Sequence, residues 1–199
     1  MKFNSKFVTV AALAVLTVSS QAVQLVANGD FQDENSIAWS ENGAFPIVGA
    51  FNQGAFGTPG NRYAWLGGYN NATDTLSQVI NFGSQTGTAT LTFDFQKRDR
   101  DISSFDFFTV RIGNTVLESI DLGTGSNGFS GVVTKSYDVS AFMGTGTRTL
   151  RLRATTDVSG TSSAFVDNVS IEAMPVPEPA TMALLGLGLA AIARRRKSA

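Results

Sequence analysis

The chain contains no cysteine and no histidine among its 199 residues. Without cysteine it cannot form a disulfide, so any folded domain depends on its own core. Without histidine it lacks the commonest general base and metal ligand, and it cannot build a Ser-His or Cys-His nucleophile. These two absences exclude every site that depends on histidine or cysteine, whereas chemistry based on carboxylates remains open.

Glutamate is also scarce. Glycoside hydrolysis needs only two carboxylates at a set separation, so it survives the loss of histidine and cysteine. The five glutamates are scattered, however, and no acidic residue stands in a recognisable catalytic setting: Glu34, Glu41, Glu118, Glu172 and Glu178. We therefore predict that the protein is not an enzyme.

Positive charge is rare in the middle of the chain. All 16 Asp and Glu lie between Val23 and Pro179, where only nine of the 15 Lys and Arg are found, so this body has a formal charge of −7. The negative charge disfavours nucleic acid and other polyanions as partners. Neutral polymers and divalent cations remain possible as partners.

The N-terminus has the three parts of a secretory signal. Lys2 and Lys6 form a basic region, residues 7–18 are apolar, and Ser20-Gln21-Ala22 offers small residues for signal peptidase. We expect residues 1–22 to be removed, with cleavage after Ala22.

The C-terminus combines a proline break, an apolar run and a basic tail. Pro177 and Pro179 keep the residues before them out of helical geometry, so a helix begins only afterwards, over residues 180–193. Its length of roughly 21 Å is short against the roughly 30 Å of a bilayer core. The cations at 194–197 reach the headgroups and hold this end in the cytoplasm, which leaves the body outside. The alternative that both ends are amphipathic packing helices lacks the charged opposite face that such helices need.

Residues 175–199 resemble the PEP-CTERM sorting signal of bacterial exported proteins. The resemblance rests on Pro177, Glu178 and Pro179, the apolar run, and the cluster Arg194, Arg195 and Arg196. It implies recognition by an exosortase-type membrane protease that cuts near the Pro-Glu-Pro, commonly in bacteria that secrete exopolysaccharide. The expected location is a transient inner-membrane anchor followed by the cell surface or the extracellular matrix.

Residues 23–174 show the alternation of a β protein. Apolar residues recur with period two in short runs separated by Gly, Asn, Asp, Ser and Thr. The clearest predicted strands are 75–80, 89–95, 107–112, 116–120, 132–137, 149–154 and 164–171. Gly113-Asn114-Thr115 predicts a tight hairpin turn. Many short strands joined by such turns favour a single all-β domain, an antiparallel β-sandwich or jelly roll.

Three segments of this body resemble the galactose-binding-like jelly roll of many carbohydrate-binding modules. They are residues 25–32 with Trp39, residues 63–68 followed by 76–79, and the closing residues 165–171. Such folds host binders, accessory domains of enzymes and purely structural units, so the fold alone does not assign a function.

The resemblance also implies a structural calcium site, because the opening motif and the last strand lie side by side in relatives. Carried over, it nominates Asp30, Gln32 and Asp167. The family commonly has Glu where this chain has Gln32, so one ligand charge is lost and the affinity falls or the site is absent. The alternative is that Asp30 caps a turn and Asp167 pairs with a loop. No other cofactor is expected.

Aromatic and amide side chains gather in the loop-rich first third of the body. An aromatic ring stacks on the C–H face of a sugar while amides bind its hydroxyls, so we nominate Trp39, Tyr63, Tyr69, Asn70 and Asn71 as glycan-binding residues. Trp65 beside Leu66 is typical of a core residue. The charged run 97–101 is typical of a solvated strand end with weak local ion pairs.

These observations predict an exported, exosortase-processed surface or matrix protein that binds polysaccharide without catalysis. The alternative is a structural matrix or surface-coat protein that acts by self-association and has no saccharide site. An exposed aromatic platform near Trp39 and Tyr69 favours the first. A flat, Thr-rich sheet face with unprotected edge strands favours the second.

Overall fold

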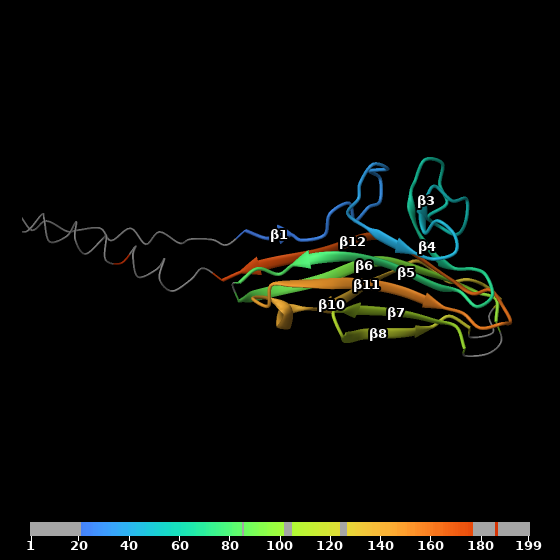
Figure 1. Ribbon diagram of the computed structural model, residues 1–199. Coiled ribbons are helices and arrows are strands. Elements are labelled where there is room, and N and C mark those ends of the chain that lie inside the picture. The colour runs from blue at the N-terminus through green and yellow to red at the C-terminus, as the bar shows by residue number, and fades with distance from the viewer. Residues whose placement is uncertain (1–20, 85, 102–104, 124–126, 177–185, 187–199) are drawn as a thin grey trace, which may run out of the picture.

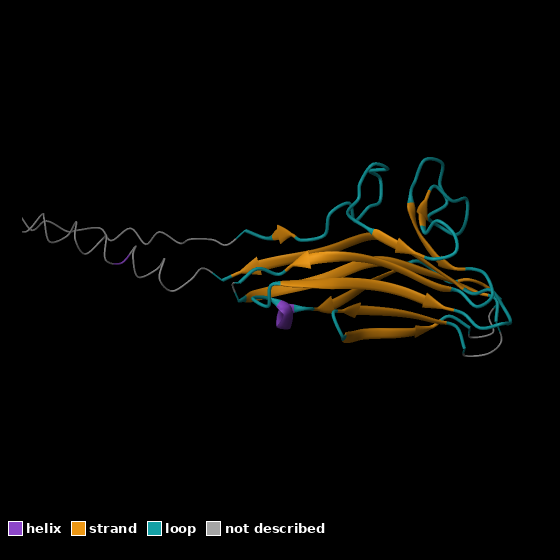
Figure 2. Ribbon diagram, viewed as in Figure 1, coloured by secondary structure: helices purple, strands orange, loops and turns teal. Residues whose placement is uncertain are grey.

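The computed structural model describes residues 21–84, 86–101, 105–123, 127–176 and 186. Within them the chain forms two antiparallel sheets that pack face to face, as Figure 1 and Figure 2 show. The predicted all-β sandwich is confirmed. The predicted signal peptide, 1–22, and C-terminal helix, 180–193, lie outside the described residues except for residues 21 and 22 and for Gly186, which is helical.

One sheet has seven strands in the order β10-β6-β12-β4-β3, with β1 paired to β12 and β9 paired to β6. Its strands are β1 (Val23–Gln24), β3 (Val48–Gly49), β4 (Tyr63–Gly67), β6 (Gly87–Asp99), β9 (Gly128–Phe129), β10 (Val133–Asp138) and β12 (Ser163–Pro175).

The other sheet has five strands in the order β2-β5-β11-β7-β8. They are β2 (Ser40–Asn42), β5 (Thr73–Asn81), β7 (Phe107–Ile112), β8 (Thr115–Asp121) and β11 (Thr147–Thr155). A single 3₁₀ turn, η1 (Ser140–Phe142), joins β10 to β11 in the described part of the chain.

The core fills the space between the sheets. Alternate residues of each strand point inward, as the period of two requires, and the largest of them are fully buried. Phe95 of β6 stacks on Phe108 of β7 with 5.2 Å between ring centroids, so the two sheets are joined directly by aromatic contact.

All seven predicted strands are present, and most are longer than the sequence pattern indicates. β6 continues from the predicted Phe95 to Asp99 because its backbone pairs with β9 and β12 beyond the last alternating phenylalanine. The hairpin turn between β7 and β8 is also confirmed, with Gly113 in the left-handed region at φ +57°.

A bulge in β12 attaches the opening segment of the body to the sheet. The register of β12 on β6 shifts between Asp167 and Ser170, and Asn168 has a positive φ. Val169 donates its N–H to the carbonyl of Gly29, and a Cβ on Gly29 would lie only 1.8 Å from the Val169 oxygen. The opening segment and the last strand therefore lie side by side, as the resemblance implies.

The two ends of the body meet at one end of the sandwich. Val23 of β1 pairs with Ala173 of β12, and Figure 1 shows β1 beside the end of β12. The 13-residue strand β12 runs from Ser163 to Pro175, so its two ends lie roughly 40 Å apart at about 3.4 Å per residue. The loops around β3 rise above the sandwich (Figure 2). No helix among the described residues has the length and hydropathy to cross a membrane.

Candidate functional site

An aromatic cavity of about 350 Å³ lies beside the end of β4. It is formed by the β2–β3 loop, the β3–β4 loop, β4 itself, the β4–β5 loop and the start of β5. Its lining residues, which define the aromatic cavity from here on, are Phe45, Pro46, Phe51, Trp65, Gly67, Gly68, Tyr69 and Asp74. A mostly apolar lining with a single carboxylate is typical of small-molecule and saccharide sites.

Asp74 is the only carboxylate of this lining, and it is held by two donors. Tyr69 donates its hydroxyl hydrogen to one oxygen, and the other oxygen accepts the backbone N–H of Gly67 at 2.8 Å. Burial raises the pKa of Tyr69, and the hydrogen bond to Asp74 raises it further. The tyrosine therefore stays protonated and keeps the carboxylate in one orientation.

Phe45 forms the outer wall of the cavity. It is 64% exposed, and its ring packs edge-on against Tyr69 with 5.1 Å between centroids. An exposed aromatic ring that is fixed by a second ring offers a rigid apolar surface with little side-chain entropy to lose on binding.

Trp65 brings an unused donor to the cavity. Its indole N–H is buried without a hydrogen-bond partner, and so is the hydroxyl of Ser163, within the described structure. Both atoms lie about 3 Å from the point where a Cβ of Gly68 would stand. A side chain at position 68 would therefore crowd these two unsatisfied polar groups, so glycine is the residue that fits beside them. Buried polar groups without a partner are rare and favour a ligand that can bind them.

The structure brings three of the five predicted glycan-binding residues to this region. Tyr69 lines the cavity, and the exposed side chains of Asn70 and Asn71 follow it in the β4–β5 loop. Asn71 has a positive φ and donates its N–H to the carbonyl of Asp157, which ties the loop to the next one.

The other two predicted residues have structural positions. Tyr63 is fully buried, and its hydroxyl bonds to the backbone of Phe51 and Gln53, so its ring is not available for stacking on a sugar. Trp39 is half-buried against the core, lies 5.4 Å from the ring of Phe31, and donates its indole N–H to the carbonyl of Asn28 at 2.9 Å. Trp39 is not part of the cavity wall.

Phe45 was missed because nothing in its local sequence separates it from the other phenylalanines. Trp65 was assigned to the core, and its ring does pack against Phe51 and Phe165. Its other edge lines the cavity, which no local pattern indicates.

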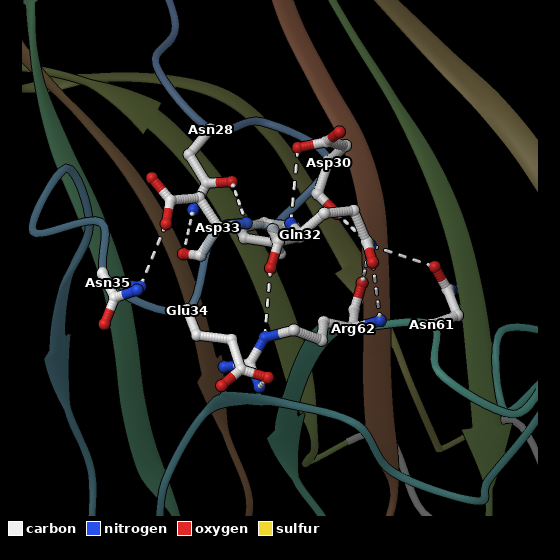
Figure 3. Close-up of polar contacts among 9 residues, drawn as sticks. Asn28, Asp30, Gln32, Asp33, Glu34, Asn35, Asn61 and Arg62 are labelled. Atoms are coloured by element: carbon white, nitrogen blue, oxygen red, sulfur yellow. Dashed lines mark hydrogen bonds and ion pairs between the residues drawn. The ribbon is translucent and has the colours of Figure 1, made fainter.

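Two of the three residues nominated for calcium, Asp30 and Gln32, lie in the opening loop, where Figure 3 shows Gln32 at the centre of the polar contacts. The third, Asp167, lies on β12. The amide nitrogen of Gln32 is 2.6 Å from the carbonyl oxygen of Asp30, 2.9 Å from that of Arg62 and 3.0 Å from Oδ1 of Asn61. Asn61 in turn donates its side-chain N–H to Asp167 at 3.2 Å.

The orientation of the Gln32 amide decides what the point of converging oxygens can hold. The donor end of the Gln32 amide occupies that point and supplies the positive partner that the oxygens need. The reversed amide would set four oxygens against one another, which only a cation could stabilise. Burial raises the pKa of Asp167, and nearby Asp94 and Asp30 act in the same direction, against hydrogen bonds from Asn61 and Asn168.

A second group of carboxylates, which was not predicted, lies at the end of the sandwich opposite to β1. Single oxygens of Asp101, Asp106 and Asp157 lie within 4.8 Å of one another. Asp106 accepts the backbone N–H groups of Asp157 and Ser162, so it holds this loop together. The prediction of a solvated run at 97–101 is wrong for Asp99 and Asp101, which are buried.

Comparison with known proteins identifies the C-terminus. Residues 175–197 match the PEP-CTERM protein-sorting motif. The chain carries a PEP-CTERM sorting signal. This motif indicates an exported protein, and it contains the predicted Pro177-Glu178-Pro179 and the cluster 194–196. A search of curated proteins finds no match to the chain.

Solved structures confirm the fold of the body. The carbohydrate-binding module TmCBM61, in complex with β-1,4-galactotriose, superposes with a TM-score of 0.53 at 12% identity, covering 75% of this chain and 97% of its own. The K1 cleaved adhesin domain of Lys-gingipain from Porphyromonas gingivalis W83 gives 0.50 at 11% identity, covering 79% and 99%. At such identities these likenesses show the fold alone.

Proposed function

We propose that this exported protein binds polysaccharide without catalysis, and that the aromatic cavity is its binding site. After export it is anchored briefly in the inner membrane, cut by an exosortase-type protease and retained at the cell surface or in the matrix. The observation that carries the proposal is the cavity itself, with the exposed ring of Phe45, the fixed carboxylate of Asp74 and the unused donor of Trp65.

The chemistry of the cavity suits a neutral sugar. Phe45 and Tyr69 supply apolar ring surface, while Asp74 and the Trp65 indole N–H supply one acceptor and one donor for hydroxyl groups. A volume of about 350 Å³ is at the lower end of small-ligand sites, which suits a short stretch of a glycan rather than a large aglycone.

A non-catalytic role is supported by the same lining. Hydrolysis of a glycosidic bond needs a second carboxylate across the cleft, and the cavity lining contains only Asp74. Both of its oxygens already accept hydrogen bonds, from Tyr69 and Gly67. It is arranged to hold a ligand hydroxyl rather than to transfer a proton.

The position of the cavity supports a role at the surface. Gly67 pairs with Ser163 at the start of β12, whereas the other end of β12 leads to the sorting signal. A protein tethered through its C-terminus therefore presents the cavity roughly 40 Å from the tether. The proposal does not depend on a metal at Gln32, because the cavity lining contains none of the residues nominated for calcium.

The test is glycan binding by the purified chain, with β-1,4-galactan, other plant glycans and the producing organism's exopolysaccharide as probes. Phe45→Ala is expected to weaken binding at least tenfold, because it removes the exposed wall of the cavity. Phe105→Ala is the matched control, since Phe105 is equally exposed at 64% but does not line the cavity. Equal binding by both variants would assign any affinity to another surface.

The alternative of a structural protein without a saccharide site has its own support. β8 and β10 are edge strands whose exposed residues include Val116 and Val133. Concentration-dependent self-association in sedimentation velocity, together with no binding to any glycan, would favour this alternative over the proposal.

A further inference from the structure

Three arginines share the outer face of the five-stranded sheet, on the side that does not pack against the core. They line a hollow of about 360 Å³, which we call the arginine face: Asn42, Thr73, Thr75, Arg111, Arg151 and Arg153. The hollow crosses β2, β5, β11 and β7 and does not include any residue of the aromatic cavity.

The strand register explains why these residues meet. Arg151 and Arg153 alternate with the buried Leu150, Leu152 and Ala154, so both point outward from β11. Arg111 on β7 is directly opposite Arg151, and Thr75 on β5 is opposite Arg153. Positions two apart on a strand are about 6.8 Å apart and neighbouring strands about 4.8 Å, so the three guanidinium groups cover one continuous area.

The positive charge of this face is not neutralised within the protein. Among the described residues, none of the three guanidinium groups lies within 4.0 Å of a carboxylate oxygen. Arg151 donates only to the carbonyl of Gly113, at 3.2 Å, and Nε of Arg111 is buried without a partner. Like charges directly opposite on neighbouring strands destabilise a sheet, so the arrangement favours an anion from outside.

The carboxylates of the same sheet lie elsewhere. Asp74 is buried, while Glu41 and Glu118 pair with the core residues Leu76 and Val110 and so lie on the inner side. Asp121 ends β8, and its Oδ1 accepts the N–H of Gly123. The outer face of the other sheet is acidic, because Thr90 pairs with Asp138 on one side and Glu172 on the other. The charge of the body is thus divided between two faces.

We propose that the arginine face binds an acidic polysaccharide through its carboxylate or sulfate groups. Arginine matches such groups with two parallel hydrogen bonds, and the hydroxyl and amide groups of Thr73, Thr75 and Asn42 bind the neutral hydroxyls between them. Three cations among neutral groups suit a polymer whose charges are spaced by uncharged atoms. A denser polyanion such as nucleic acid is repelled by the net charge of −7 on the body.

This site is separate from the aromatic cavity and does not depend on the proposed function. The net negative charge of the body disfavours polyanions as partners. At the arginine face, however, the local charge is positive, so an anionic group is attracted there. Face-to-face pairing of two copies through this surface is opposed by the same three charges.

The experiment measures binding of the full-length chain in detergent micelles to polygalacturonate, heparin, dextran and a single-stranded DNA oligonucleotide. We expect saturable binding to polygalacturonate or heparin that weakens as salt rises, and no binding to dextran through this face. Arg153→Gln should weaken binding about tenfold, the fold-change expected for one lost charge-assisted contact. Arg148→Gln is the matched control, because Arg148 is also an exposed arginine on β11. It is opposite Ile80, a residue of the inner face, and so does not belong to the arginine face.

Four outcomes would overturn the proposal. The first is equal affinity of the Arg153→Gln and Arg148→Gln variants for the acidic polymer, and the second is an affinity for DNA as high as for polygalacturonate. The third is that the chain binds no acidic polymer. The fourth is that Arg153→Gln changes the oligomeric state without any effect on polymer binding. Loss of acidic-polymer binding in Phe45→Ala but not in Arg153→Gln would assign the affinity to the aromatic cavity instead. Circular dichroism of each variant checks the fold.

Discussion

Tyr69 and Asp74 form one unit at the base of the aromatic cavity: the tyrosine hydroxyl donates to a carboxylate that is only 3% exposed. The contact joins the β4–β5 loop to β5 and orients the one charged group of the cavity lining. A buried carboxylate that loses a donor keeps its desolvation cost, so this pair links the stability of the fold to the shape of the site.

Tyr69→Phe is expected to lower the free energy of unfolding by about 1–3 kcal/mol, because it leaves one oxygen of Asp74 without its donor. Urea denaturation of the variant and the wild type measures this directly. Glycan affinity should fall as well, since Asp74 is no longer held by the tyrosine. An unchanged urea midpoint would show that water replaces the hydroxyl as a donor to Asp74 and that the pair does not contribute to the stability of the fold.

Ionisation of Tyr137 should reduce the stability of the fold at high pH. Burial raises the pKa of Tyr137 most, and its hydrogen bond to Glu118 and the charge of Glu118 raise it further. The folded pKa is therefore above the unfolded value of about 10, so the stabilising contribution is complete below pH 10 and is lost as the pH rises above it.

Tyr137→Phe provides the measurement. The variant should be less stable than the wild type at pH 8, because Glu118 keeps Lys135 but loses the hydroxyl. The difference in the free energy of unfolding should narrow between pH 10 and pH 11.5, since the wild type alone carries the unfavourable ionisation of this residue. A constant difference across that range would contradict the raised pKa.

Gln32→Glu should make the opening loop depend on calcium. The substitution replaces the donor amide with a carboxylate that faces the oxygens of Asp30, Asn61 and Arg62. In chelator the variant should unfold at a lower temperature than the wild type, and calcium should restore it, because carboxylate and carbonyl oxygens are the ligands that calcium prefers.

The wild type is the control for this variant, and we expect its melting temperature to be the same with calcium and with chelator. A rise with calcium in the wild type would mean that the Gln32 amide is reversed and that the ion is bound there after all. Magnesium serves as a second control, since its smaller octahedral shell fits such a loop poorly.

Trp39→Ala should reduce stability rather than glycan affinity. The indole ring packs on Phe31 and its N–H donates to the carbonyl of Asn28, so truncation leaves a partial cavity and removes one of the two donors to that carbonyl, the other being the N–H of Phe31. We expect a loss of about 2–3 kcal/mol, less than for a fully buried tryptophan. Glycan binding by the folded fraction should match the wild type, and a selective loss of affinity would return Trp39 to the binding site.

Much of the architecture could be predicted because strand formation is local. Alternation such as Leu91, Phe93 and Phe95 against Thr90, Thr92 and Asp94 indicates a sheet with one buried face, and β6 has that arrangement. The strand ends were less accurate, since β6 extends to Asp99 through pairing with strands far away in the sequence.

The candidate site was predicted only in part, for reasons that particular residues illustrate. Trp39 and Phe45 both lie in the same loop-rich stretch, and the larger aromatic was nominated. The indole N–H of Trp39 found a backbone acceptor and the ring joined the core, whereas Phe45 packs on Tyr69 with most of its surface exposed. Whether an aromatic ring is covered depends on segments that the local sequence does not identify.

By itself, the sequence determined the C-terminal signal and the class of the fold, because a proline break, an apolar run and a period of two act over a few neighbouring residues. Only the tertiary structure decided which groups meet. Arg111 and Arg151 are 40 positions apart and become neighbours through the register of β7 on β11, and Asp74 reaches Tyr69 through the turn between β4 and β5. Sites depend on such pairing because their chemistry requires side chains a few ångströms apart, whatever their separation along the chain.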